Sequence, residues 1–191
     1  MLDSVKKDKL SKILQPLGAL QVVDNFDNTC THLTVPQQTE ISHKILQALA
    51  SCKSIVTLSF WKALIESVHK NQALPEASNY LPNIRERAGV SSEAASLKVN
   101  PERKKLFFGK IFVFISNTQM EVYKEIITHA RGTYKLVTGM QSKSCCASNI
   151  IVIQPKSSSN TQSSNERTIM KVNCKFYKFT QQIKTNFIFQ F

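Results

Sequence analysis

The sequence predicts an α/β protein made of two small units, each a parallel sheet flanked by helices. Short apolar segments of strand length alternate with amphipathic helical segments, which is the order typical of such a fold. This order occurs once before residue 70 and again after residue 104. The stretch between them contains three prolines, which indicates a linker. A chain of 191 residues with 42% hydrophobic side chains has room for two small cores.

The first unit is expected to begin with a helix over residues 8–17. Apolar side chains recur there at i, i+3, i+4 and i+7, which places them on one helical face. Pro16 should distort or end the helix, because proline lacks the N–H group that a helix interior uses. Gly18 then supplies a stop signal. The apolar face consists of Leu10, Ile13, Leu14 and Leu17.

Three short strands and two more helices are expected next. The strands are predicted over residues 20–23, 32–35 and 54–57, and a helix is predicted over residues 40–51. Ser59 is predicted to cap a last helix, because a serine oxygen can accept the unpaired N–H groups of a first helical turn. The predicted apolar face of that helix contains Phe60 or Trp61, Leu64, Ile65 and Val68.

The second unit starts with a continuous apolar run over residues 110–115. Such a run is typical of a central strand that is buried on both faces. A helix should follow, ended by Gly132 as its C-cap, and then two strands over residues 134–137 and 150–153. The apolar face of the helix contains Met120, Tyr123, Ile127 and Ala130.

The end of the chain has an unusual composition. Residues 156–168 are rich in serine and asparagine, which predicts a flexible loop. Residues 172–191 mix lysine with aromatic and polar residues, without glycine, proline or an acid. We expect this tail to diverge from any domain, as in a truncated or alternative product. A non-functional product with an aggregation-prone apolar end is one interpretation of it.

The net charge of +12 is unevenly distributed. Residues 1–125 carry 16 basic and 12 acidic side chains, whereas residues 126–191 carry nine basic side chains and only Glu166 as an acid. Non-specific contact between nucleic acid and this basic half is therefore an alternative function. No apolar run spans a membrane, and the five cysteines show no CxxC pair, which favours a reducing compartment such as cytosol or nucleus.

Signs of catalysis or of a bound cofactor are missing from the sequence. His43, His69 and His129 belong to no HExxH motif and have no cysteine at ligand spacing, so no metal or other cofactor is expected. A glycine-rich phosphate loop and hydrolase motifs are also missing. We therefore predict a protein that is not an enzyme, with Trp61 in the core.

The ordered motifs of this chain resemble the BRCT family. Thr31-His32-Leu33-Thr34 lies where that family commonly has Thr-His-Leu-Val, and Phe60-Trp61 lies where it has a buried aromatic residue. Gly18-Ala19 corresponds to a frequent Gly-Gly pair, and Lys104–Ile115 resembles the start of a second unit. The resemblance implies two tandem units, each a four-stranded parallel sheet flanked by helices, with His32 in a structural role.

The same resemblance implies that both units are incomplete. We expect residues 1–70 to form a first unit without its first, central strand, and residues 71–103 to form a linker. Residues 104–155 should be the N-terminal part of a second unit, and residues 156–191 the loop and divergent tail. Less apolar surface is then buried, and we expect marginal stability.

The resemblance implies a phosphate pocket to which two residues of this chain contribute. Family members that bind phosphopeptides use a hydroxyl and a backbone N–H from the loop after the first strand and a lysine from the second helix. These positions correspond to Ser4 and Lys44. A cation and hydroxyl donors near a helix N-terminus suit a phosphate dianion. Val5 stands where the family often has glycine, which disfavours a close backbone approach.

The implied function is an adaptor in the DNA double-strand-break response, acting in the nucleus at damage foci. It would bind phosphorylated Ser/Thr motifs on mediator proteins and would retain a break-processing nuclease complex in support of checkpoint signalling. The most similar family members also bind a nuclease–ATPase complex and the ATM kinase, through regions that we expect to be absent here. We also expect weak contact with DNA and no membrane partner.

Overall fold

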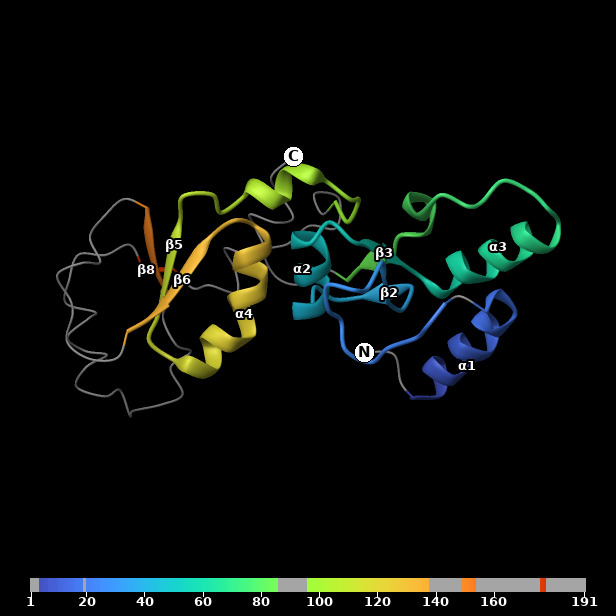
Figure 1. Cartoon of the computed structure of the whole chain (residues 1–191), viewed down its shortest axis with the longest axis horizontal. Helices are drawn as coiled ribbons and strands as arrows, with labels where there is room; N and C mark the ends of the chain where they lie inside the picture. The colour runs from blue at the N-terminus through green and yellow to red at the C-terminus, as the bar shows by residue number, and fades with distance from the viewer. Residues whose placement is uncertain (1–3, 19, 86–95, 138–148, 154–175, 178–191) are drawn as a thin grey trace. The chain divides into compact units, whose positions relative to one another are not determined.

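Helices and strands alternate along the chain in the computed structural model (Figure 1). The structure describes residues 4–18, 20–85, 96–137, 149–153 and 176–177. Its contacts divide the chain into two units, the first ending at Asn100 and the second beginning at Pro101. No helix of the described ranges is long and apolar enough to cross a bilayer.

The first unit contains two short parallel pairs of strands with helices around them. β1 pairs with β3, and β2 pairs with β4, both in parallel. The elements are α1 (Ser4–Leu14), η1 (Gln15–Leu17), β1 (His32–Thr34), β2 (Gln38–Thr39), α2 (His43–Ala50), β3 (Ser54–Val56), α3 (Leu58–His69), η2 (Ala77–Tyr80) and β4 (Asn83–Ile84).

The first helix agrees with the sequence pattern. α1 packs beside α3, and Leu10 and Leu14 are buried against Phe60 and Trp61 (Figure 1). Pro16 converts the last turn to the 3-10 helix η1, and Gly18 ends it in the left-handed region at φ 60°. Pro16 and Gly18 therefore distort and end the helix as predicted.

Two local predictions for this unit are wrong. Residues 20–23 form no strand, because no strand of the described chain lies beside them to share hydrogen bonds. Thr57, not Ser59, is the N-cap residue of α3, and Ser59 lies within its first turn. Ser59 instead shares a hydrogen bond with the Thr57 hydroxyl at 2.6 Å.

The segment after α3 packs onto the first unit. The Tyr80 carbonyl accepts hydrogen bonds from the Thr57 N–H at 3.0 Å and from the Thr57 hydroxyl at 3.1 Å. The Tyr80 ring lies 5.8 Å from the ring of Phe60. β4 then pairs with β2, and Arg85 N–H donates to the Thr39 carbonyl at 2.8 Å. The sequence pattern does not predict this second strand pair.

The second unit is built on one four-stranded parallel sheet, with strand order β6-β5-β7-β8. β5 lies between β6 and β7, as its continuous apolar run predicts. Helix α4 packs against β5 and β6 (Figure 1). The elements are η4 (Pro101–Lys105), β5 (Ile111–Phe114), α4 (Asn117–His129), β6 (Thr133–Leu136), β7 (Ile150–Ile153) and β8 (Phe176–Tyr177).

Gly132 has a different role from the C-cap that was predicted. Ala130 caps α4, and Arg131 takes the left-handed conformation at φ 60°. A Cβ atom on Gly132 would lie 2.8 Å from Ile127 Cγ2 and 2.9 Å from Phe107 Cβ. Glycine is therefore required there for close packing between α4 and the loop before β5.

Two residues of the predicted tail take part in the second sheet. Phe176–Tyr177 form β8, which pairs in parallel with Val152 and Ile153 of β7. Residues 154–175 and 178–191, which hold the rest of the predicted loop and tail, lie outside the described residues.

Candidate functional site

Lys44 lies in the first turn of α2. The Ser42 side chain caps this helix by accepting a hydrogen bond from the Ile45 N–H at 3.4 Å. Ile45 and Leu49 are buried and fix the helix against its own unit. The cap and the buried face together hold Lys44 at the positive end of the helix, which favours anions.

The Lys44 ammonium group bonds to a loop far away in the sequence. Its Nζ donates to the Asp24 carbonyl at 2.9 Å, and this contact is exposed to solvent. A lysine ammonium carries three donors, so this bond leaves two for another acceptor. Lys44 is therefore positioned by the loop and still able to bind an anion.

Lys53 holds the other end of the same loop. Its Nζ donates to the Asn28 carbonyl at 3.2 Å. Cys52 precedes it in the left-handed conformation at φ 55°, which turns the chain at the end of α2. Sequence reasoning missed Lys53, because nothing in its local pattern shows a contact to a loop 25 residues away.

The loop between these lysines is organised by Asp27. Its carboxylate accepts hydrogen bonds from the Thr29 N–H at 2.8 Å and from the Thr29 hydroxyl at 2.6 Å. These bonds, with the hydroxyl contributing most, lower the pKa of Asp27 below its usual value. Asp27 is therefore ionised at neutral pH, and its carboxylate holds the loop through Thr29.

Ser4, the other predicted pocket residue, is the first residue of α1. Its side chain lies outside the described part of the structure. Nothing described joins Ser4 to Lys44, so its role as a hydroxyl donor stays a prediction.

His32 belongs to an aromatic cluster that packs the first unit. Its ring stacks on Phe60 at 5.4 Å and meets Trp61 edge-on at 5.2 Å. Trp61 Nε1 donates to the Thr34 hydroxyl at 2.8 Å. Burial lowers the pKa of His32, because desolvation disfavours the imidazolium ion. These contacts suit the structural role that the sequence indicates for His32.

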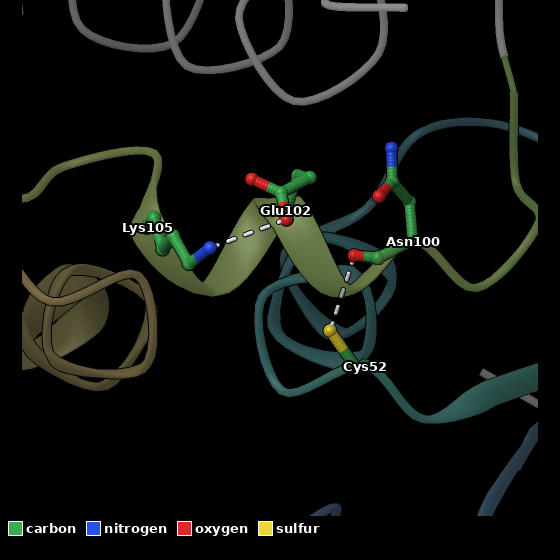
Figure 2. A network of polar contacts seen from close by, with 4 residues as sticks. All are labelled: Cys52, Asn100, Glu102 and Lys105. Carbon is green, nitrogen blue, oxygen red and sulfur yellow. Dashed lines mark hydrogen bonds and ion pairs between the residues drawn. The ribbon is translucent and has the colours of Figure 1, made fainter.

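Metal-ligating groups do not gather in the described residues: no set of three or more His, Cys, Asp or Glu side chains could hold an ion there. Cys52 instead donates its thiol to the Asn100 carbonyl at 3.3 Å (Figure 2). This bond ties the end of α2 to the last residue of the first unit, just before Pro101.

Similar solved structures are pairs of BRCT domains. The BRCT5–BRCT6 domains of Brc1 from S. pombe align with a TM-score of 0.55 and 15% identity, over 84% of this chain and 78% of that one. Rtt107p in complex with a phosphorylated histone aligns with a TM-score of 0.52 and 16% identity, over 94% of this chain and 80% of that one. These likenesses confirm the predicted tandem BRCT fold.

Sequence comparison narrows the relationship to nibrin. Residues 101–183 match the family described as the second BRCT domain on Nijmegen syndrome breakage protein. Nibrin of Danio rerio is 31% identical over 157 residues, which cover 78% of this chain and 19% of that protein. Nibrin of Gallus gallus is 32% identical over 136 residues, or 71% of this chain and 18% of that protein. The chain thus spans about a fifth of the length of these relatives.

Proposed function

We propose that the chain is a phosphopeptide-binding adaptor of the DNA double-strand-break response, acting in the nucleus and without catalysis. The position of Lys44 carries the proposal: it lies at the N-terminus of a capped helix and has two donors left for an acceptor. The relationship to nibrin and the phosphorylated histone bound to Rtt107p support this function. The ligand would be a phosphorylated Ser/Thr motif on a mediator protein.

The chemistry of the site suits a phosphate dianion. Helix α2 directs its first N–H groups and its dipole toward the same end at which Lys44 lies. Ser4 would add a hydroxyl donor from the start of α1. Charge-assisted hydrogen bonds of this kind are stronger than neutral ones, which would favour a phosphorylated peptide over a bare one. Retention of a break-processing nuclease complex, in support of checkpoint signalling, is part of the same proposal.

A peptide titration tests the proposal. The full chain is titrated with a doubly phosphorylated Ser-Asp-Thr-Asp peptide and with the same peptide without phosphate. We expect Lys44→Met to weaken binding of the phosphorylated peptide by about tenfold or more, because one charge-assisted hydrogen bond is lost. Equal affinity of the unmodified chain for both peptides would exclude phosphate recognition.

Two controls separate phosphate binding from loop anchoring. Lys62→Met removes an exposed lysine of α3 and should leave the affinity unchanged. Lys53→Met removes the other contact to the 24–28 loop without touching the α2 N-terminus. If Lys53→Met and Lys44→Met weaken binding equally, Lys44 acts by holding the loop and not by contacting phosphate.

A further inference from the structure

Three segments of the second unit meet at the amino end of its sheet. Phe107 N–H donates to the Ala130 carbonyl at 2.9 Å, and Thr133 N–H donates to the Lys110 carbonyl at 3.0 Å. Asn149 Nδ2 donates to the Gly109 carbonyl at 3.2 Å. The loop before β5, the turn between α4 and β6, and the residue before β7 therefore form one continuous surface.

Phe108 projects from this surface into solvent. It exposes 73% of its area, more than any other large apolar side chain in the described ranges. Its neighbour Phe107 is 3% exposed, with its ring 4.7 Å from that of Phe112. Gly109 turns the chain at φ 73°, and Lys110 N–H bonds back to the Phe107 carbonyl at 2.9 Å. This tight turn buries Phe107 and directs Phe108 outward.

Three exposed cationic side chains belong to the segments that form this surface. Lys104 lies in η4, Lys110 follows the Phe108 turn, and Arg131 lies on the adjoining turn after α4. Residues 103–115, 126–137 and 149–153 contain no acidic side chain. Glu102, the nearest acid in sequence, is 3.3 Å from Lys105 and forms an ion pair with it (Figure 2). We call the surface of Lys104, Phe108, Lys110 and Arg131 the basic aromatic surface.

We propose that the basic aromatic surface binds single-stranded nucleic acid. A single exposed phenylalanine needs no explanation, but one set among cations combines the two contacts that a single strand uses. Bases stack on an exposed aromatic face, and lysine or arginine side chains follow the phosphates. A loop presents this surface, and a loop does not fill a major groove as a helix would, which favours a single strand over a duplex.

Fluorescence anisotropy of a labelled 20-nucleotide thymidine strand with the full chain tests this surface. Phe108→Ala should weaken binding by at least about fivefold through loss of stacking, whereas Phe108→Trp should retain it. Leu74→Ala, which shortens an exposed apolar side chain of the first unit, is the matched control and should have no effect.

The salt dependence tests the lysines separately. Lys104→Gln combined with Lys110→Gln should lower the slope of log K against log salt by about 1.4, since each phosphate contact contributes about 0.7. The control pair Lys12→Gln and Lys62→Gln should leave the slope unchanged. Phosphopeptide affinity should stay the same in every variant, so this test and that of the adaptor function can fail independently.

Two results would overturn the proposal. Binding that changes less than twofold in Phe108→Ala would place the contact elsewhere in the basic half of the chain. Equally tight binding of a 20-residue polyglutamate peptide would show that the surface attracts acidic chains in general rather than nucleic acid.

Discussion

At the scale of single residues, His32 shows how burial sets a charge state. Its ring is half-buried between Phe60 and Trp61, and Nδ1 lies 2.9 Å from the Thr31 hydroxyl. An imidazolium ion there would lose hydration without gaining an acid as a partner in these contacts. The lowered pKa of His32 follows from this desolvation.

Stability should therefore fall as the pH is lowered past the pKa of an unfolded histidine. The unfolded chain binds the His32 proton more readily than the folded chain, so protonation favours unfolding. The stabilisation is fully present above about pH 6.5 and is lost as the pH falls toward the lower folded pKa. Urea unfolding at pH 7.5 and 5.5 measures the effect. His32→Gln should reduce this dependence, and His69→Gln, at an exposed position, should not.

At the scale of elements, three helices end in the same way without glycine. Each has a left-handed residue after its cap: Cys52 after α2, Asn71 after α3 and Arg131 after α4. In α4, Arg131 N–H bonds to the Thr128 carbonyl at 3.0 Å and Gly132 N–H to the Ile127 carbonyl at 2.8 Å. This is the Schellman arrangement, in which glycine is the usual left-handed residue. At these three ends the left-handed position itself is not marked by glycine in the sequence.

Arg131→Gly should stabilise the second unit by about 1 kcal/mol, because a side chain in the left-handed region costs roughly that much. Asn71→Gly should increase stability by a smaller amount, since asparagine tolerates the left-handed conformation. Thermal or urea unfolding of the two variants measures the difference. A loss of stability in Arg131→Gly would mean that the arginine side chain makes a contact worth more than the backbone strain.

At the scale of the whole molecule, the two units differ in how their strands are paired. β5 has a strand on each side, whereas β1 pairs only with β3 among the described strands. The bond from Val35 N–H to the Val56 carbonyl, at 3.0 Å, fixes which β1 amides face β3. The amides of His32 and Thr34 therefore face the opposite edge, since strand residues alternate in direction.

Hydrogen exchange should show this difference residue by residue. All amides of β5 should exchange slowly, because alternate residues bond to β6 and to β7. In β1 the Leu33 amide should be protected, and those of His32 and Thr34 should exchange much faster. Similar protection of all three amides would show that another strand covers this edge. The expected marginal stability of the chain would appear first in this unit.

The sequence by itself determined the elements whose signal is local. The helical spacing of Leu10 and Leu14, the stop at Gly18 and the apolar run of β5 all depend on neighbours within one turn or one strand. Ordered motifs such as Thr31-His32-Leu33 and Phe60-Trp61 also identified the family correctly. These features are read along the chain, so no tertiary contact is needed to see them.

Only the tertiary structure decided the features that join distant residues. The bonds from Lys44 and Lys53 to the 24–28 loop, the β2–β4 pair, and the addition of β8 to the second sheet all cross long sequence separations. Strand pairing and lysine–carbonyl bonds need partners brought together by folding, and short segments carry no mark of which partner they will meet. The strand predicted over residues 20–23 failed for the same reason, because a strand exists only beside another strand.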